Sequence, residues 1–265
     1  MATLPSSADP LVIEDLTVAY GSVTAVDGLS LRVRAGEIYG LLGSNGAGKT
    51  STMKAIVGLV QPASGRIRVA GRDPVSEDMA VKEMVGYVPE TALLYDALSP
   101  REFLEFVASV RRLRYDDYGS LVHELVGALQ VGADMDRPLA TLSNGTRQKL
   151  LLVAAFLHRP RLLVLDEPFN NLDPRSVRIM RDLLTAYVRE GNRAALFSTH
   201  TVEVAERLCH RLAILDGGKL QGEGTLAELR TMIRRPEATL EDVYLGLTAE
   251  GEATTRAMEL LRGKA

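Results

Sequence analysis

The chain has 265 residues and a formal net charge of -3, with 46% hydrophobic residues and no tryptophan. This length suits one large α/β domain, or two closely joined ones, with a sizeable core. Non-specific nucleic-acid binding requires a marked basic excess, so the charge argues against nucleic acid as a partner. Cys209 is the only cysteine, which excludes an intrachain disulfide and a multi-cysteine metal site.

Neither the amino terminus nor any apolar run predicts membrane insertion. The longest uninterrupted apolar run, residues 150–157, is too short for a spanning helix. Residues 1–10 are rich in Ser, Ala and Pro, lack the basic and apolar regions of a secretory signal, and are predicted to form a disordered tail. We therefore expect a cytoplasmic protein whose membrane role, if any, is exerted through a partner.

Two β-prone stretches come first. Residues 11–20 and 29–33 favour strands, the second by clean alternation of apolar and polar residues. We expect residues 21–28 to join them into an antiparallel flap. Tyr20, at the end of the first strand, could stack on a nucleotide base if a phosphate site lies nearby.

A phosphate-binding loop follows. Residues 37–42 predict a strand and residues 51–59 a helix, and the turn between them matches G-x-x-x-x-G-K-[ST] from Gly43 to Thr50. Its glycines let backbone N–H groups approach phosphate oxygens, and the helix start adds its positive dipole end. Lys49 would reach the β- and γ-phosphates, and Thr50 would bind Mg²⁺. The predicted nucleotide-binding residues are Tyr20, Gly43, Ser44, Asn45, Gly46, Ala47, Gly48, Lys49, Thr50 and Ser51.

A helical insertion interrupts the strands of the core. After a turn at Ser64-Gly65, residues 67–69 predict a strand, and residues 86–90 a short buried strand stopped by Pro89. Residues 91–137 are mostly helical by periodicity. One predicted helix face carries Phe103, Phe106, Val107 and Val110, and a second helix carries Leu121, Val122, Leu125, Val126 and Leu129.

Two acidic residues end the next buried strand. Ser143 is a natural N-cap for a long helix that carries an apolar face towards the core. Residues 161–168 are then predicted to form a fully buried strand with Asp166 and Glu167 at its carboxyl end. Ligands bind at this end of the strands in open parallel sheets. A structural alternative is that these carboxylates cap the following helix.

The rest of the chain alternates helices and strands. Helices are predicted at 175–190, 202–211 and 226–234, strands at 194–198 and 212–215, with a hairpin at Gly217-Gly218. Thr239 and Asp242 form a variant capping box for a last helix, and residues 249–265 are predicted to form a loose charged helix. The expected organisation is a tail at 1–10, a core domain at 11–234 with a helical subdomain at about 91–140, and a helical extension at 235–265.

The order of these motifs resembles the ATP-binding subunits of ABC transporters from residue 11 to about residue 247. The phosphate loop alone is shared by many nucleotide-binding families, but five further motifs in this order are highly specific. They are residues 87–90, 142–146, 163–168, 171–173 and 198–200. The resemblance implies a P-loop NTPase core with a mainly parallel sheet, an antiparallel β subdomain and an α-helical subdomain.

The chemistry of the residues supports this resemblance independently. Phosphoryl transfer to water needs neutralised charge, a positioned metal and an oriented nucleophile. Asp166 can hold Mg²⁺ while Glu167 polarises the attacking water. The resemblance adds His200 as a contact to the γ-phosphate and Glu90 as a further oxygen near the metal. The catalytic residues would be Lys49, Glu167 and His200, the metal residues Thr50, Glu90 and Asp166, and the cofactors ATP and Mg²⁺.

In the family, a second cassette completes each site. The resemblance implies a head-to-tail dimer in which one subunit presents a helix N-terminus to the γ-phosphate held by the other. A serine-capped helix N-terminus is a physically plausible anion site. The residues expected to act across the interface are Ser143, Asn144, Gly145, Thr146 and Asp173.

Three positions depart from the family pattern. Asn144 and Thr146 stand where glycine and glutamine are usual, and Glu90 stands where glutamine is usual. Asparagine tolerates a left-handed backbone, so the turn can survive with a weaker contact. Glu90 adds a negative charge near the phosphates, so we expect altered metal affinity rather than lost activity. Glu90 followed by Leu94-Tyr95 is similar to bacterial exporter-type cassettes that work with separate membrane subunits.

Four functions are to be compared with these residues. The first is an ATPase motor that drives export through separate permease subunits, with residues 91–104 docking on the partner. The second is a soluble cassette ATPase, although the chain has one cassette and no room for a long coiled coil. The third is a GTPase, but the guanine motif Asn-Lys-x-Asp is missing. The fourth is a catalytically weak regulatory cassette, which Glu90, Asn144 and Thr146 keep open. We predict the first, at the inner face of the cell membrane.

Overall fold

Two β-sheets organise the protein in the computed structural model, which describes residues 9–92 and 94–248. The first is antiparallel with strand order β2-β1-β4. The second has order β5-β6-β7-β3-β8-β9 and is parallel except for the antiparallel pair β8–β9. Together with the helical subdomain, this arrangement is the P-loop NTPase fold that the sequence predicts. The strands are β1 (Leu11–Tyr20), β2 (Val23–Val33), β3 (Ile38–Leu42), β4 (Ser64–Val69), β5 (Val85–Val88), β6 (Leu162–Leu165), β7 (Ala194–Thr199), β8 (Arg211–Asp216) and β9 (Lys219–Gly224).

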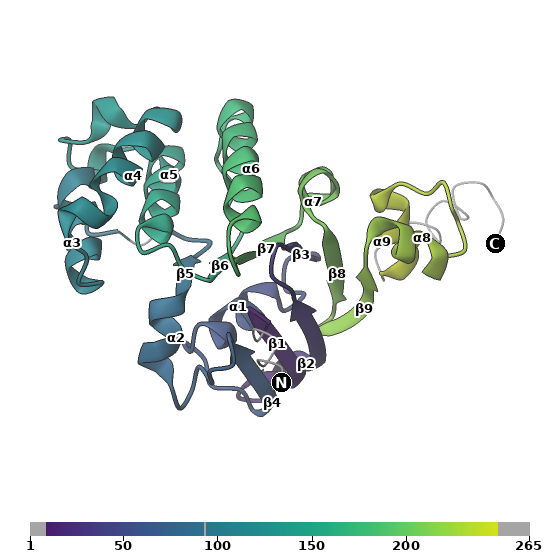
Figure 1. The fold of residues 1–265 in the computed structure, drawn as a ribbon. Coiled ribbons are helices and arrows are strands. Elements are labelled where there is room, and N and C mark those ends of the chain that lie inside the picture. Colours follow the sequence, from purple (N-terminus) through teal and green to yellow (C-terminus); the bar gives the residue numbers. More distant parts are fainter. Residues whose placement is uncertain (1–8, 93, 249–265) are drawn as a thin grey trace, which may run out of the picture.

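The helices fall into groups around the larger sheet. Figure 1 shows α3, α4 and α5 together at one side of the molecule, α6 beside them, and α8 and α9 at the opposite end beyond β9. We refer to α3, α4 and α5 as the helical lobe. The helices are α1 (Lys49–Ile56), α2 (Asp78–Met84), α3 (Pro100–Val110), α4 (Tyr115–Ala128), α5 (Asn144–Phe156), α6 (Pro174–Arg189), α7 (Val202–Leu208), α8 (Leu226–Met232) and α9 (Leu240–Leu247).

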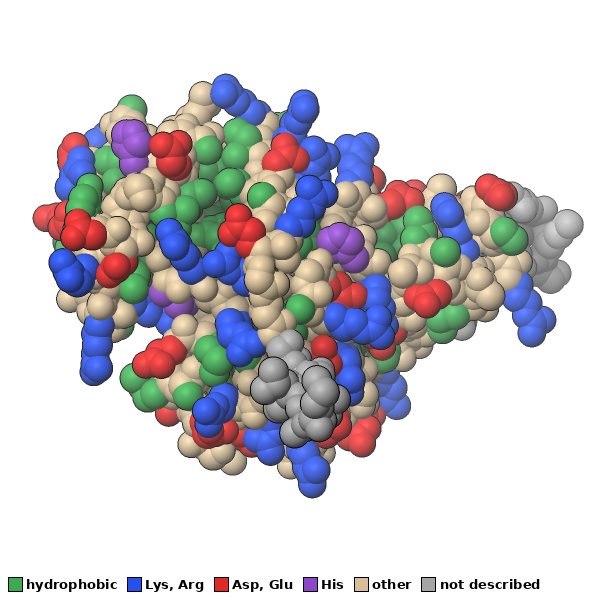
Figure 2. All heavy atoms as spheres, viewed as in Figure 1, with side chains coloured by type: hydrophobic (Ala, Val, Ile, Leu, Met, Phe, Trp, Pro, Cys, Tyr) green, Lys and Arg blue, Asp and Glu red, His purple; other side chains and the backbone are tan. Residues whose placement is uncertain are grey.

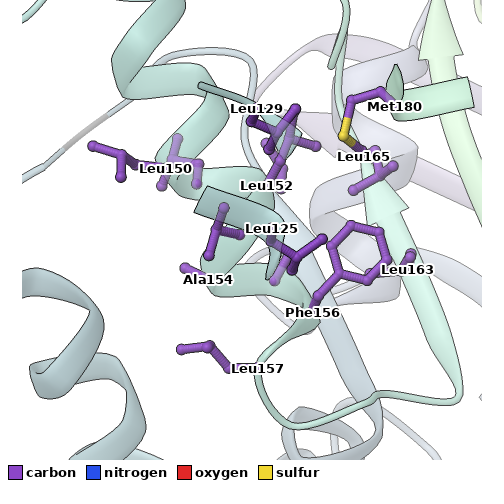
Figure 3. Packing of buried hydrophobic residues seen from close by; sticks show 14 of the residues in the cluster. Leu125, Leu129, Leu150, Leu152, Ala154, Phe156, Leu157, Leu163, Leu165 and Met180 are labelled. Atoms are coloured by element: carbon purple, nitrogen blue, oxygen red, sulfur yellow. The ribbon is translucent and has the colours of Figure 1, made fainter. Parts of the chain in front are cut away.

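A continuous apolar cluster joins the helical lobe to the larger sheet. Figure 3 shows Leu125 of α4 and Leu129, the residue after its end, near Leu152 and Phe156 of α5, with Leu163, Leu165 and Met180 beside them. Leu163 and Leu165 of β6 and Met180 of α6 are fully buried in the same cluster. Each fully buried large apolar side chain contributes about 1.5–3 kcal/mol. The lobe is therefore held against the strand that carries the two acidic residues.

Local signals set the helix starts as expected. The Ser143 hydroxyl accepts a hydrogen bond from the Thr146 amide at the start of α5. Thr239 and Asp242 form the predicted capping box of α9, with both reciprocal hydrogen bonds present. Each such cap stabilises its helix by about 1 kcal/mol because it satisfies an amide that has no partner within the helix.

Several predicted boundaries were wrong because strand pairing overrode local signals. Strand β2 starts at Val23, which pairs with Tyr20, so the connection is two residues rather than residues 21–28. Ser64 and Gly65 belong to β4 instead of a turn. Helix α7 ends at Leu208 rather than at residue 211, because Arg211 pairs with Tyr39 at the start of β8. Helix α2 was not predicted.

The predicted tail and one predicted helix face also need correction. Pro10 is buried, and its carbonyl accepts a hydrogen bond from the Ala70 amide, so residue 10 is packed against the protein and does not belong to a disordered tail. Predictions for residues 1–8 and 249–265 lie outside the described residues. In α3, Phe106 and Val110 are 44% and 66% exposed. The buried face instead carries Phe103, Leu104 and Ala108.

The surface mixes charges of both signs. On the face shown in Figure 2, acidic and basic side chains are interspersed, and hydrophobic side chains gather between the helical lobe and α6. A groove of about 350 Å³ between α4, α5 and α6 is lined by apolar side chains that include Leu121, Phe156 and Leu183. Over residues 9–92 and 94–248, the helices are all too short or too polar to cross a membrane.

Candidate active site

The loop between β3 and α1 is shaped by close backbone contacts. Gly48 is the N-cap of α1 and has φ +99°, a conformation that disfavours side chains. A Cβ at Gly48 would lie 2.5 Å from the Ala25 carbonyl oxygen, and one at Gly43 would lie 2.4 Å from that of Leu215. Larger residues at these positions would push the loop away from the strands that hold it. Glycine is therefore also required at these two positions because the neighbouring backbone leaves no room for a Cβ.

The Lys49 ammonium is held inside this loop. Its side chain is 6% exposed, and Nζ donates hydrogen bonds to the carbonyl oxygens of Gly43 at 2.7 Å and Ser44 at 3.1 Å. The same Nζ lies 3.4 Å from Glu167 Oε1. The positive charge is thus fixed between the loop and the carboxylate that follows β6, which is separated from β3 by β7 in the sheet.

A cleft of about 400 Å³ opens above the loop and gathers most of the predicted nucleotide and metal residues. It is lined by Tyr20, Ala25, Ser44, Asn45, Gly46, Gly48, Lys49, Thr50, Ser51, Glu90 and Glu167. Tyr20 is 48% exposed at the end of β1, where its ring forms part of the wall. The predicted residues Gly43 and Ala47 belong to the loop without lining the cleft. Ala25 was missed because β2 was expected to begin later, at residue 29.

The two acidic residues follow β6 in different conformations. Asp166 is fully buried, and its Oδ1 accepts a hydrogen bond from Ser198 Oγ at 2.5 Å. Glu167 has a left-handed backbone with φ +48°, and its amide donates to the same hydroxyl oxygen at 2.9 Å. Helix α6 begins at Pro174 and is capped by Asp173. Neither carboxylate caps that helix, so the structural alternative raised by the sequence is wrong.

His200 reaches Glu167 from the adjacent strand. Strands β6, β7 and β3 are neighbours and run parallel, so their carboxyl ends meet at one edge of the sheet. His200 follows β7, and its Nδ1 lies 3.0 Å from Glu167 Oε1. Glu167 Oε1 is therefore flanked by an imidazole and, from the β3 side, by the Lys49 ammonium. The structure brings together all three residues predicted to be catalytic.

The site has oxygen ligands that suit Mg²⁺. Asp166 Oδ2 is buried without a hydrogen-bond partner among the described residues, and Thr50 and Glu90 line the adjacent cleft. Three or more His, Cys, Asp or Glu side chains do not cluster as metal ligands anywhere in the described part of the chain. A magnesium ion would therefore also need phosphate or water oxygens, as it commonly does. Burial and the charges of Asp166 and Glu90 raise the pKa of nearby Tyr87 to about 12.

The residues expected to act across a dimer form a separate group. Ser143, Asn144, Gly145 and Thr146 start α5, and a Cβ at Gly145 would lie 2.5 Å from the Asn171 carbonyl oxygen.

Asp173 is connected to the helix of this group, α5, through Lys149. Its carboxylate accepts hydrogen bonds from the Ser176 hydroxyl and amide and from Lys149 Nζ at 3.2 Å. The bonds from Ser176, followed by the one from Lys149, hold the pKa of Asp173 well below its usual range. The residues that line the cleft of the same chain do not include Asp173 or residues 143–146.

Ser198 was absent from the predicted site residues. Its hydroxyl contacts Asp166 and the backbone of Glu167, and its side chain is fully buried. A signal for it was available, because Ser198 follows four consecutive apolar residues of the buried strand and precedes His200 by two residues. A hydroxyl within a buried strand needs a hydrogen-bond partner.

Known proteins share this arrangement. The family model described as ABC transporter matches residues 26–170. The ABC-type transporter ATP-binding protein EcsA of Bacillus subtilis is 33% identical over 240 residues, covering 91% of this chain and 97% of that protein. The Nod factor export ATP-binding protein I of Burkholderia pseudomallei is 35% identical over 218 residues, covering 82% and 71%.

A solved structure agrees in fold and in sequence. The structure described as the ATP-binding subunit of an ABC transporter superposes with a TM-score of 0.85 at 31% sequence identity, covering 89% of this chain and 98% of that one. The shared length, the fold and the nucleotide cleft lead to the same conclusion. The chain belongs to the ABC transporter family and is the ATP-binding subunit of an ABC transporter.

Proposed function

We propose that this protein hydrolyses MgATP as a cassette dimer and that hydrolysis drives a substrate through separate membrane permease subunits. The observation that carries the proposal is the position of Glu167, whose Oε1 lies 3.4 Å from Lys49 Nζ and 3.0 Å from His200 Nδ1. A carboxylate held beside a phosphate-binding lysine at a cleft is suited to orient and deprotonate a water molecule.

The neighbouring residues have separate tasks in this proposal. Lys49 exchanges its bonds to the loop carbonyls for the β- and γ-phosphates, and the backbone amides of the loop bind the remaining phosphate oxygens. Thr50, Asp166 and Glu90 hold Mg²⁺, which when bound neutralises charge on the transferring phosphate. His200 donates to the γ-phosphate while its Nδ1 stays near Glu167. Tyr20 stacks on the base from the exposed edge of the cleft.

A second cassette is needed in this proposal because Asp173 and residues 143–146 do not line the cleft of their own chain. Ser143 sits at the N-terminus of the 13-residue helix α5, where amides and dipole favour an anion. Thr146 makes a 3.0 Å hydrogen bond to the Ser143 hydroxyl, so the departure from glutamine leaves the serine in place at the helix start. Head-to-tail pairing would bring this helix end to the γ-phosphate bound by the partner.

The permease is proposed to dock on the segment before α3. Tyr95 is 62% exposed and packs edge-to-face against Phe106, which is 44% exposed, with ring centroids 5.5 Å apart. Exposed aromatic side chains of this kind are enriched in protein interfaces. The stretch predicted from sequence, residues 91–104, contains Tyr95 but not Phe106. Docking there would hold the subunit at the inner face of the membrane.

Export is the proposed direction. The relatives include a protein named for Nod factor export, and the residues Glu90 and Leu94-Tyr95 resemble exporter-type cassettes. A soluble cassette without a permease remains the competing function. The exposed Tyr95–Phe106 pair favours the transporter, because a soluble cassette does not need an apolar surface on which a permease docks.

Mg²⁺-dependent ATP hydrolysis by the purified protein, measured against protein concentration, tests the proposal. We expect the rate to rise faster than linearly, because two chains complete each site. Glu167→Gln is the control, since it keeps the size and polarity of the side chain without its basicity. ATP binding without hydrolysis in the parent chain would contradict the catalytic part and favour a regulatory cassette. Co-purification with membrane subunits, compared between the parent and Tyr95→Ala, tests the partner.

A further inference from the structure

Ser198 connects the two acidic residues of the site through a single atom. Its Oγ lies 2.5 Å from Asp166 Oδ1 and 2.9 Å from the Glu167 amide nitrogen. A carboxylate can only accept and an amide N–H can only donate, so the hydroxyl must donate to Asp166 and accept from Glu167. Both hydrogen bonds are therefore fixed in direction.

The bond to Asp166 decides which carboxylate oxygen remains available. Oδ1 is occupied by Ser198, whereas Oδ2 is buried and has no partner among the described residues. The Asp166 amide is fixed as well, donating to the Val88 carbonyl at 2.8 Å. A buried carboxylate oxygen without a partner is costly unless a cation or water binds it. Ser198 thus leaves one defined oxygen free for Mg²⁺.

The bond to Glu167 acts on the backbone instead. Glu167 has φ +48°, a left-handed conformation that residues with side chains adopt only when their surroundings enforce it. The Ser198 hydroxyl holds the Glu167 amide in this conformation. Strands β6 and β7 are parallel with Leu165 opposite Phe197, so Ser198 lies one residue further along beside Asp166. The position is set by sheet register and not by a flexible loop.

We propose that Ser198 is a positioning residue that orients Asp166 for Mg²⁺ and Glu167 for the attacking water. This inference rests on the proposed ATP hydrolysis and gives a role to a residue that lies within the motif at residues 198–200 but was not among the predicted site residues. Ser198 itself is fully buried and does not line the cleft, so it acts through the two carboxylates. Partners that orient metal ligands in this way typically change metal affinity or activity by about 10- to 100-fold when removed.

The experiment compares Ser198→Ala with Ser198→Thr in the full chain. The alanine variant removes the hydroxyl, and the threonine variant keeps it. We expect Ser198→Ala to lower kcat about 10- to 100-fold. The Mg²⁺ concentration that gives the half-maximal rate should rise by about 10-fold. The KM for ATP at saturating Mg²⁺ should be nearly unchanged. Ser198→Thr should recover most of the rate. Thermal denaturation of each variant checks that the fold is retained.

A second readout does not depend on turnover. Calorimetric titration with ADP, with and without Mg²⁺, measures how much the metal strengthens nucleotide binding, and we expect Ser198→Ala to lose most of that gain. Thr185→Ala is the matched control because it also removes a hydroxyl that bonds within the protein, to the Arg181 carbonyl on α6, and should change neither readout.

The outcomes separate this inference from the proposed function. A parent chain that binds ADP but hydrolyses no ATP would overturn the function, while the Mg²⁺ gain in ADP binding would still test Ser198. A parent chain that hydrolyses ATP together with a Ser198→Ala variant within about twofold of it in kcat and Mg²⁺ dependence would overturn the positioning role alone. A folded Ser198→Thr variant as defective as Ser198→Ala would also overturn the positioning role, because a hydroxyl at this position would then not restore activity.

Discussion

His200 Nδ1 lies 3.0 Å from Glu167 Oε1, and the two residues come from the ends of neighbouring strands. The Glu167 side chain is only 5% exposed, whereas that of His200 is 48% exposed. The carboxylate is therefore fixed inside the protein, whereas about half of the imidazole surface is open to solvent. Lys49 Nζ lies 3.4 Å from the same Glu167 oxygen, so that oxygen is flanked by an ammonium and an imidazole.

Glu167→Gln should abolish most hydrolysis and keep ATP binding. The amide retains the hydrogen-bonding shape but cannot accept a proton from water, so the ATP-bound dimer should accumulate. Size-exclusion chromatography with and without MgATP, combined with phosphate release, measures both effects. A variant that hydrolyses at the parental rate would remove Glu167 from the proposed role.

Lys49→Ala should reduce turnover by roughly two to three orders of magnitude, as with other single electrostatic contacts to a transition state. The ammonium is nearly buried beside Glu167, so its removal also leaves that carboxylate without a cation at 3.4 Å. Single-turnover hydrolysis at saturating MgATP is the measurement. Lys54→Ala in the last turn of the same helix is the control, and an unchanged rate in Lys49→Ala would contradict the phosphate assignment.

Two substitutions at Ser143 separate a helix cap from a phosphate contact. Ser143→Ala removes the acceptor for the Thr146 amide and should destabilise α5 by about 1 kcal/mol. Ser143→Asp keeps an N-cap acceptor but adds a negative charge, so it should retain stability and lose most hydrolysis. Urea denaturation and ATPase rates measure the two effects. Equal activity of Ser143→Asp and the parent would argue against a phosphate at this helix end.

Glu90→Gln should alter the Mg²⁺ dependence without abolishing activity. Glu90 lines the cleft together with Thr50 and Glu167, so the substitution removes one negative charge near the proposed metal. We expect the Mg²⁺ concentration for half-maximal hydrolysis to rise about two- to fivefold because Coulomb attraction weakens. The measurement is the rate of ATP hydrolysis by Glu90→Gln and by the parent across a Mg²⁺ titration. A complete loss of activity would mean that the carboxylate itself takes part in the chemistry.

His158 should make the fold sensitive to mild acid. Burial, reinforced by the nearby Arg111 charge, lowers the pKa of His158 to about 4. The unfolded chain binds a proton near pH 6.5 but the folded chain does not, so stability should fall as the pH drops from about 6.5 towards 4. Partial solvent exposure limits the loss to the order of 2 kcal/mol. The midpoints of urea denaturation at pH 7 and pH 4.5 measure this loss of stability. In the variant His158→Gln, the difference between the two midpoints should be smaller.

The sequence alone determined the features that depend on neighbouring residues. The loop from Gly43 to Thr50, the Ser143 cap and the capping box at Thr239 were all predictable, because each depends on side chains and backbone groups within a few residues. The apolar strand before Asp166 was equally clear, since a buried parallel strand reads as a continuous apolar run.

Only the tertiary structure decided the features that depend on strands far apart in the chain. The start of β2 at Val23 and the end of α7 at Leu208 follow from pairing between strands, which local propensity does not contain.

The bridge from Ser198 to Asp166 and Glu167 has the same origin. It joins residues 32 and 31 positions apart, and only the register of β6 against β7 brings them within hydrogen-bonding distance. The motifs supplied the chemical groups, and the sheet placed them at one edge because parallel neighbouring strands end together.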